Sequence, residues 1–403
     1  MTIAMGLMAS NLLQNAIDRA EPGSKLQLPA GEYHGNIVID KPLIIDGVDQ
    51  RAKIVGDGNG TVVKIRSDYV TLKNLTILHS GQEHERVDAG VSIKKARHVT
   101  VDHCRIDDCL FGIDLEQVHA SALTHNWIRS KPFSLGLRGD AIRLWYSNDN
   151  NVSFNHITHS RDVVVWYSHG NTIAHNFGEY SRYSLHFMYA GRNEVLYNTY
   201  EHNSVGIFFM YSRDTVAIGN VVKSSLGTTG MGIGLKDSSN FTLKDNTLIY
   251  CAQGLYIDRS PFQPDMRNKI IGNHILYNAE GIHFHSVSVN NDIEKNVFKG
   301  NIDNVIDDEP DLHHALKNHW DHNYWDDYQG FDKNSDGIGD TPYVLFYYAD
   351  RMWMFNPSVK FFYASPVISM MNFLAKLAPI SEPVKILVDK HPVMYETKLE
   401  GKQ

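Results

Sequence analysis

The stretch from residue 195 to residue 222, VLYNTYEHNSVGIFFMYSRDTVAIGNVV, decides the fold because it contains one pattern twice. An apolar residue and two others precede Asn198, and the same arrangement returns 22 positions later at Asn220. The pattern recurs along most of the chain, with successive spacings between 21 and 29, at Asn126, Asn155, Asn176, Asn246, Asn273 and Asn296. The chain is therefore a repeat protein with a period near 22 residues.

Short alternating runs such as GIDL and GIHF, separated by Gly, Asn, Asp and Ser, make each repeat strand-like rather than helical. A leucine-rich repeat has a similar period, but its Leu-x-x-Leu-x-Leu pattern does not recur here. We therefore expect an all-β fold, a right-handed parallel β-helix of about ten coils stacked about 4.8 Å apart. Asparagines in one row of such a stack can bond to the coils above and below as an Asn ladder.

Changes in composition divide the chain into four segments. SNLLQNAIDRA has a serine N-cap and helically spaced apolar residues, which predicts a helix that caps the first coil. After residue 300 the Asn column stops and the chain becomes aromatic, then apolar with prolines. The expected segments are an N-terminal segment with cap helix (1–22), the β-helix (23–317), an aromatic and Asp-rich last-coil segment (318–350) and a partly helical C-terminal tail (351–403).

Composition excludes several function classes. The net charge of −8 gives no basic field for nucleic acid. Three cysteines without a CxxC pair indicate neither a disulfide framework nor a thiolate zinc site. No run reaches the roughly 20 apolar residues that span a bilayer, and the N-terminal IAMGLMA is too short for a complete signal peptide.

Strand alternation separates the inward from the outward residues of the second strand in each coil. Phe187 and Phe209 belong to the row predicted to point inward, together with Leu115, Leu144, Val165, Leu235, Ile257 and Phe284. The neighbouring outward rows bring His186, Met188 and Met210 onto one outer face, with Met231 nearby.

Outward methionines beside tryptophans are unusual for a solvated strand, and two readings stay open. The face is either a hydrophobic surface for another protein or loop, or a soft metal site, because thioether and imidazole together select Cu(I). His283 and His285 lie on the same two rows further along and form a second metal candidate.

A calcium-like loop follows the repeats. In DKNSDGIGD, Asp332, Asn334, Asp336 and Asp340 place oxygen donors at loop positions 1, 3, 5 and 9. Position 12 is Tyr343 rather than the usual Glu, so Ca²⁺ would need another carboxylate. Asp- and Gly-rich turns also form without metal, and both readings stay open.

An enzyme acting on acidic polysaccharides is the alternative function, because lyases and epimerases of this class are often β-helices. Such chemistry needs carboxylates or a base clustered in one groove. The outward rows offer only scattered acids, and RGDAIR (138–143) is the best local approximation. We therefore assign no catalytic residues.

The run NHWDHNYWDDYQGFDKNSDGIGDTPY (318–343), following the Asn repeats and the opening LQLPAGEY, resembles the NosD family over almost the whole chain. These are periplasmic β-helical accessory proteins of nitrous oxide reductase maturation. The resemblance implies a non-catalytic periplasmic protein, with its signal peptide removed, that binds or relays copper. It also implies as partners the ABC transporter subunits NosF and NosY, the copper donor NosL and the reductase apoprotein, with membrane contact only through the transporter.

The tail contains one amphipathic helix candidate, SPVISMMNFLAKLAP. Helical spacing places five apolar residues on one face, namely Val367, Met370, Met371, Leu374 and Leu377. This face either covers the last coil or docks on the partner transporter, and the amount of apolar surface favours docking.

Overall fold

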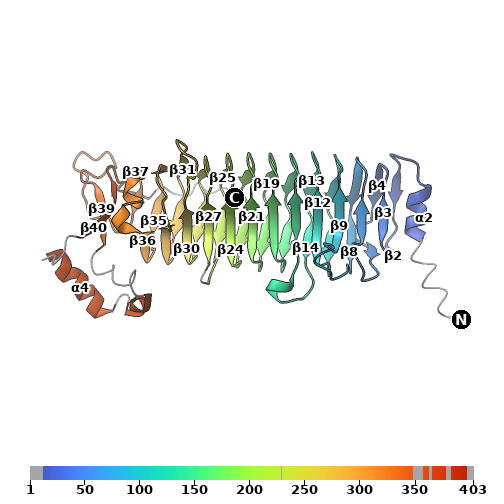
Figure 1. Cartoon of the computed structure of the whole chain (residues 1–403), viewed down its shortest axis with the longest axis horizontal. Helices are drawn as coiled ribbons and strands as arrows, with labels where there is room; N and C mark the ends of the chain where they lie inside the picture. Colours follow the sequence, from blue (N-terminus) through green and yellow to red (C-terminus); the bar gives the residue numbers. More distant parts are fainter. Residues whose placement is uncertain (1–11, 228, 348–356, 363–364, 378–382, 397–403) are drawn as a thin grey trace.

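The protein is a long right-handed parallel β-helix in the computed structural model, which describes residues 12–227, 229–347, 357–362, 365–377 and 383–396 (Figure 1). Each coil contributes one short strand to each of three parallel sheets. Each strand pairs with its counterparts in the preceding and following coils, so residues about 22 positions apart in sequence become neighbours in space.

The first sheet contains β1 Lys25–Gln27, β4 Leu43–Asp46, β7 Val70–Lys73, β10 Thr100–Asp102, β13 Ala122–Thr124, β16 Asn151–Ser153, β19 Thr172–Ala174, β22 Glu194–Leu196, β25 Val216–Ile218, β28 Thr242–Lys244, β31 Asn268–Ile271, β34 Asn291–Glu294 and β37 His319–Asp321. The second contains β2 Gly31–His34, β5 Ala52–Val55, β8 Leu75–Leu78, β11 Arg105–Asp107, β14 Trp127–Arg129, β17 His156–Thr158, β20 Phe177–Glu179, β23 Thr199–Glu201, β26 Val221–Lys223, β29 Thr247–Ile249, β32 His274–Leu276, β35 Val297–Lys299 and β38 Tyr324–Trp325. The third contains β3 Ile37–Ile39, β6 Val63–Ile65, β9 Ala89–Lys94, β12 Phe111–Glu116, β15 Ile142–Trp145, β18 Asp162–Trp166, β21 Tyr183–Met188, β24 Val205–Met210, β27 Met231–Lys236, β30 Gln253–Asp258, β33 Glu280–Phe284 and β36 Asp303–Asp307.

Other elements lie at the ends and in two loops. The antiparallel pair is β39 Tyr343–Tyr347 with β40 Val384–Asp389. The described helices are α2 Leu12–Arg19, α4 Pro366–Leu377 and the 3₁₀ turns η1 Leu135–Leu137, η2 Pro310–Leu312, η3 Ala315–Lys317 and η5 Pro357–Phe362. No helix in these described segments is long and apolar enough to span a membrane.

The β-helix prediction is confirmed, but sheets of 13, 13 and 12 strands give about thirteen coils rather than ten. The missing coils lie at both ends. The first four coils lack the corner asparagine, with Leu75 and Cys104 at its place in the third and fourth, and the last coil is built from the segment around Asn323. A count based on the Asn column therefore stopped short at each end.

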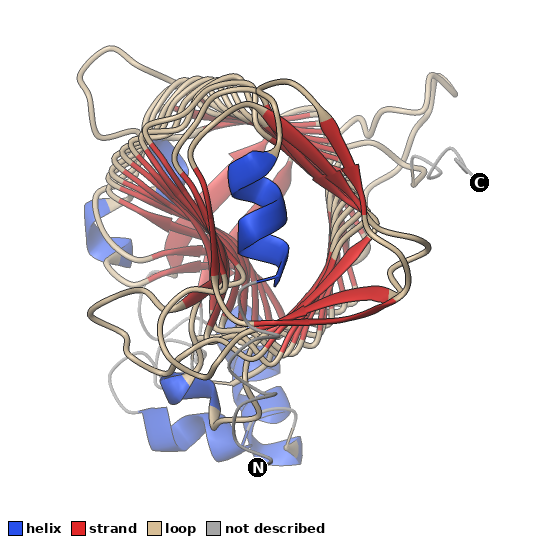
Figure 2. Ribbon diagram, turned by 90° about the vertical axis from the view of Figure 1, so that its right-hand side faces the viewer, coloured by secondary structure: helices blue, strands red, loops and turns tan. Residues whose placement is uncertain are grey.

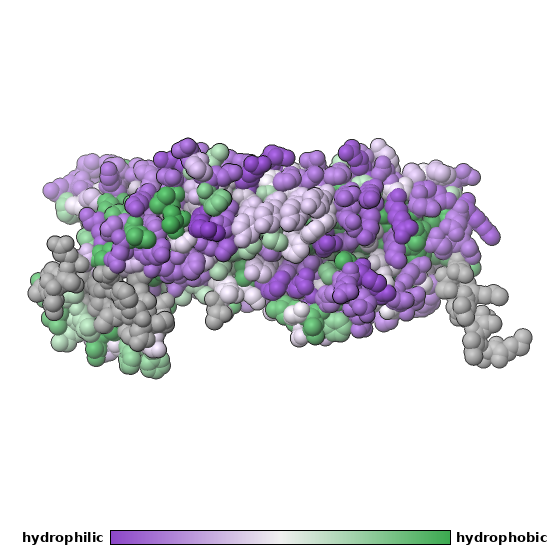
Figure 3. Space-filling model, in the orientation of Figure 1, coloured by the Kyte–Doolittle hydropathy of each residue, from purple (hydrophilic) through white to green (hydrophobic). Residues whose placement is uncertain are grey.

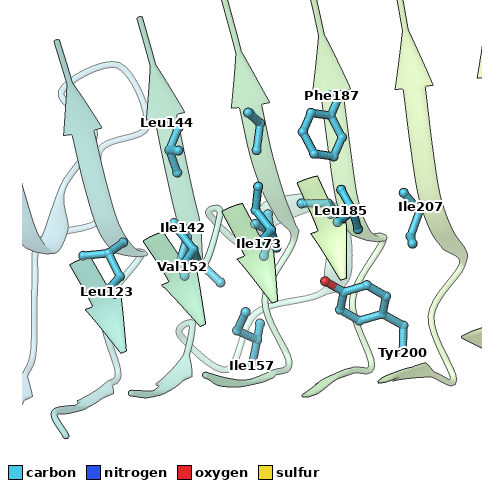
Figure 4. Close-up of a cluster of buried hydrophobic side chains, with 14 of the residues drawn as sticks. Leu123, Ile142, Leu144, Val152, Ile157, Ile173, Leu185, Phe187, Tyr200 and Ile207 are labelled. Atoms are coloured by element: carbon cyan, nitrogen blue, oxygen red, sulfur yellow. The ribbon is translucent and has the colours of Figure 1, made fainter. Parts of the chain in front are cut away.

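The core fills the inside of the coils, and the predicted inward row lies there. Phe187 and Phe209 stack with ring centroids 4.8 Å apart, and every member of the predicted row is fully buried. Figure 4 shows such side chains from successive coils forming continuous columns, including Leu144, Leu185 and Phe187. The apolar alternation thus specifies which face of each strand is buried.

The asparagine column forms the predicted ladder at one corner of the solenoid. Asn198 donates from Nδ2 to the Ile173 carbonyl and to Asn220 Oδ1, both at 2.9 Å, and its backbone N–H donates to the same Oδ1 at 3.0 Å. Asn176 makes the equivalent bonds to Asn198 Oδ1. Each buried side-chain amide therefore bonds to the preceding coil and to the next one.

The ladder ends in an acid that sequence periodicity did not reveal. The fully buried Asp389 at the end of β40 accepts hydrogen bonds through Oδ2 from the N–H and Nδ2 of Asn323, at 3.0 and 2.9 Å. Trp325 Nε1 donates to the same oxygen at 3.1 Å. A residue 66 positions further along the chain thus takes the place of the next asparagine and closes the C-terminal end.

The N-terminal end is closed by α2, which lies across the open end of the first coils (Figure 2). Leu13 and Ile17 are buried on its inner face. The Gln14 side chain bonds to both backbone groups of Val38, at 2.8 and 3.1 Å, and so satisfies the first strand of the third sheet. The predicted cap helix is present, while residues 1–11 of the N-terminal segment lie outside the described residues.

Removing one asparagine of the ladder should lower the stability of the whole β-helix. We expect Asn198→Ala to lower the free energy of unfolding by about 2 kcal/mol or more, because the buried Asn176 N–H and Nδ2 lose their acceptor. Urea denaturation followed by circular dichroism measures this. Asn151→Ala, at an exposed position in β16, is the matched control and should change the value by less than about 0.5 kcal/mol. Equal effects of the two substitutions would contradict the structural role of the ladder.

Candidate metal centre

Two outward rows cross the third sheet from coil to coil, in the predicted register. The first row reads Asp114, Arg143, Val164, His186, Phe208, Gly234, Tyr256 and His283. The second reads Glu116, Trp145, Trp166, Met188, Met210, Lys236 and Asp258. His186, Met188 and Met210 therefore lie in these outward rows, on two adjacent coils.

Met188 and Met210 are directly paired between β21 and β24, and both side chains are partly exposed. Neighbouring strands lie about 4.8 Å apart, so the two thioethers occupy equivalent positions one coil apart. The next residue in the row is Lys236, whose ammonium forms an ion pair with Asp258 at 3.0 Å. The methionine pair is therefore bounded by a tryptophan on one side and an ion pair on the other.

His186 lies in the outward row but is 9% exposed, because aromatic rings cover it. Tyr183 stacks on its imidazole at 4.9 Å, and the rings of Trp166 and Phe208 lie at 6.0 and 6.2 Å. Neither ring nitrogen has a hydrogen-bond partner. Burial lowers the pKa of His186 to about 4, so the imidazole is neutral at pH 7.

Met231 is not in the row of the other two methionines. Its partner in the next coil is Gln253, whereas the partner of Met210 is Lys236. Its sulfur instead lies 3.5 Å from the place where a Cβ on Gly234 would stand, beside the ring of Phe208. Gly234 is needed at this point because a side chain there would collide with that ring.

A band of stacked tyrosines borders the methionine pair. Tyr189 and Tyr211 directly follow Met188 and Met210 and stack at 4.9 Å, and the stack continues through Tyr167. Figure 3 shows a patch of intermediate hydropathy over the middle of the solenoid. Because the tyrosine faces are stacked on one another, they offer edges to a ligand, which suits a protein partner better than a sugar ring.

The second metal candidate is an ion-pair cluster. Asp308 Oδ2 accepts from His283 Nε2 at 3.1 Å and from His285 Nδ1 at 2.8 Å, while Glu280 lies 2.7 Å from His283 Nδ1. Burial alone lowers the pKa of His283, but the hydrogen bonds with Asp308 and Glu280 outweigh burial and raise it to about 9. A metal ion here would have to displace a proton that the carboxylates stabilise.

The acidic side chains of the calcium-like loop form hydrogen bonds with the backbone of the same loop. Asp332 accepts from the Gly337 N–H at 2.8 Å, Asp336 from the Ile338 N–H at 2.8 Å, and Asp340 from the Lys333 N–H at 2.7 Å. The Asn334 side chain bonds to Asp336. The bond from the Ile338 N–H to Asp336 is that of an Asx turn, and calcium binding stays a prediction.

The apolar face of α4 is uncovered. Ile368 is buried, whereas the five residues of the predicted docking face are 37–66% exposed, namely Val367, Met370, Met371, Leu374 and Leu377. Figure 3 shows apolar surface at this end of the molecule. The docking role stays a prediction, and much of the remaining tail lies outside the described residues.

The RGDAIR segment contains a buried charge network that the sequence did not reveal. Asp140 is 2% exposed and bonds to Arg161, which also bridges to Asp162, and Asp162 in turn pairs with Arg182. Burial raises the pKa of Asp140 to about 7, against the opposing charge of Arg161. The network lies at the start of β18 and β21, and Arg182 packs on the ring of Tyr183 at 5.2 Å from its centroid.

Two further Asp–His–His groups escaped the sequence analysis. In each, three potential ligand atoms lie within 4.8 Å of one another, and the groups are Asp102, His103 and His125, and Asp321, His322 and His391. The available signal was the Asp-His dipeptide of VDHC and WDHN, which precedes the ladder position in both coils. The second histidine of each group comes from another coil or from the tail, so no local pattern identifies it.

Comparison with known protein families gives a match over half of the chain. The family described as "Periplasmic copper-binding protein (NosD)" matches residues 125–330. A protein of Pseudomonas aeruginosa named "Probable ABC transporter binding protein NosD" is 29% identical over 438 aligned positions, covering 96% of this chain and 94% of that protein. A protein of the same name from Stutzerimonas stutzeri is 27% identical, covering 92% of this chain and 87% of its own length.

Solved structures share the fold. The A-module of the Azotobacter vinelandii mannuronan C-5 epimerase AlgE6 matches with a TM-score of 0.55 at 13% identity, over 74% of this chain and 91% of that one. PfbA, a surface adhesin of Streptococcus pneumoniae, matches with a TM-score of 0.51 at 11% identity, over 72% and 88%. At these identities the likeness shows a common architecture only.

The neutral state of His186 predicts a pH dependence of stability. Because burial lowers its pKa to about 4, the unfolded chain takes up a proton first as the pH falls below about 6.5, and stability is lost. Between pH 7 and pH 4.5 the free energy of unfolding of the wild type should fall by roughly 2 kcal/mol more than that of the His186→Phe variant. Phenylalanine is chosen because Phe208 occupies the same position in the next coil. Urea titrations at both pH values measure the difference. Identical losses in the two proteins would show that His186 is not desolvated.

Proposed function

This chain belongs to the NosD family of periplasmic copper-binding proteins, and on that premise we propose that it binds Cu(I) and relays it during assembly of the copper centres of nitrous oxide reductase. The observation that carries the proposal is the pairing of Met188 with Met210 beside a neutral, unpartnered His186. Soft sulfur donors with imidazole favour Cu(I) over Mg²⁺ or Ca²⁺.

The coil spacing suits two-sulfur binding. One ion held by two sulfurs at about 2.3 Å each accepts donors up to roughly 4.6 Å apart, which is close to the strand spacing of about 4.8 Å. His186 carries no proton that the metal would have to displace at pH 7. The second candidate, His283 and His285, is less suited to binding Cu(I), because carboxylates hold a proton on His283.

Transfer requires partners, which we propose to be an ABC transporter of the NosF and NosY type, the copper donor NosL and the reductase apoprotein. Relatives of this chain carry the name "ABC transporter binding protein". The exposed apolar face of α4 supplies the kind of surface that a transporter's periplasmic side could cover. The protein would then reach the membrane only through the transporter.

Copper binding is tested by substitution of the methionine pair. We expect Met188→Ala with Met210→Ala to weaken Cu(I) binding at least about 100-fold, because both soft donors are lost. Competition with a chromogenic Cu(I) chelator under anaerobic, reducing conditions measures the affinity. Met266→Ala, which removes an exposed methionine in a loop, is the matched control and should leave the affinity unchanged.

Two outcomes would overturn the proposal. Copper binding that survives the double substitution unchanged would remove the site from this face. Cleavage or epimerisation of alginate or another acidic polysaccharide by the purified chain would favour the enzyme alternative.

The docking face is tested separately. We expect Met370→Asp with Leu374→Asp to weaken co-purification with the NosF and NosY subunits at least about tenfold, because charges replace exposed apolar side chains at the proposed contact. Leu226→Asp, at a 63% exposed position on the solenoid, is the control. Equal retention of the transporter by both variants would rule out α4 as the docking element.

A further inference from the structure

The C-terminal strand β40 returns to the last coil and brings a histidine to its edge. Val393 forms a bridge with Tyr324 and its N–H bonds to the Asn323 carbonyl at 3.0 Å. Figure 1 shows β37, β39 and β40 together at this end of the solenoid. His391, two residues after the ladder-ending Asp389, thereby comes next to Asp321 and His322.

One carboxylate joins the two imidazoles. His391 Nδ1 lies 2.7 Å from Asp321 Oδ1, and His322 Nδ1 lies 2.7 Å from Asp321 Oδ2, with the rings 5.5 Å apart. The histidine side chains are 56% and 35% exposed. The three ligand atoms lie within 4.8 Å of one another, so one metal ion that takes the place of the Nδ1 protons can contact both imidazoles and the carboxylate.

One carboxylate between two imidazoles is a donor set for a borderline divalent ion such as Zn²⁺ or Cu²⁺, whereas Mg²⁺ and Ca²⁺ need more oxygen ligands.

The same arrangement occurs a second time, at the same corner. Asp102 ends β10, His103 follows with a positive φ, and His125 from the next coil stacks on it at 4.5 Å. Both histidines bond to the Asp102 carboxylate, at 2.8 and 3.2 Å. In the last coil no further coil can supply the third ligand, and His391 from the tail supplies it instead.

We propose that Asp321, His322 and His391 bind a borderline divalent cation that fastens the C-terminal cap to the last coil. The ion joins residues 70 positions apart, and one of its ligands lies two residues beyond the acid that closes the asparagine ladder. Binding in the folded state alone shifts the local opening equilibrium of the cap toward the closed form. This site is separate from the methionine face and takes a different class of ion.

Hydrogen–deuterium exchange of the purified chain with and without Zn²⁺ tests the proposal. At a free Zn²⁺ concentration ten times the dissociation constant, opening of the cap should be suppressed about tenfold, so amides of β40 should exchange about tenfold more slowly. His391→Ala and Asp321→Asn should abolish this slowing. His319→Ala, which removes an exposed histidine from the same strand β37, is the control and should retain it.

The readout is the ratio of exchange rates with and without Zn²⁺ in each protein, so a variant with a looser cap is still informative. His391→Gln keeps a hydrogen-bond donor near Asp321 without an imidazole and should also lose the effect. Unchanged exchange of β40 in the wild type, or slowing that persists in His391→Ala, would overturn the proposal. Neither result depends on Cu(I) binding at Met188 and Met210.

Discussion

The hydrogen bonds of the corner asparagines are the constraint on which the other features depend. Each Asn side chain donates to a backbone carbonyl of the preceding coil and to the asparagine of the next coil, and it accepts from the asparagine of the coil before it, so every turn must be placed in one register relative to its neighbours. A slip by one residue would leave buried amides unpaired and turn inward side chains outward. The ladder therefore fixes the rows on the outside of the solenoid as firmly as it fixes the core.

This register brings side chains from successive coils next to one another on the outer surface. Met188 and Met210 are 22 residues apart in the chain but adjacent on the third sheet, and the same relation stacks Tyr189 on Tyr211. A solenoid can thus build a two-sulfur site from one residue per coil, without a loop or a helix to position the donors. The rigid strands hold the thioethers, while the aromatic cover keeps His186 dry and neutral.

Sequence periodicity predicted what repeats and failed where the chain departs from the repeat. The Asn column and the inward row that contains Phe187 follow from alternation, because each is set by its own coil. The burial of His186 was not predicted, since it depends on Tyr183, which stacks on the imidazole next to a register irregularity between β18 and β21. The end of the ladder at Asp389 and the approach of His391 depend on the return of the tail, which no local pattern encodes.

The central claim is that the register places two thioether sulfurs on one copper ion. X-ray absorption spectroscopy of the chain loaded with one equivalent of Cu(I) tests it most directly, because it reports the atoms bound to the metal. We expect two sulfur neighbours at about 2.3 Å and one nitrogen at about 2.0 Å. A first shell of nitrogen and oxygen alone would contradict it.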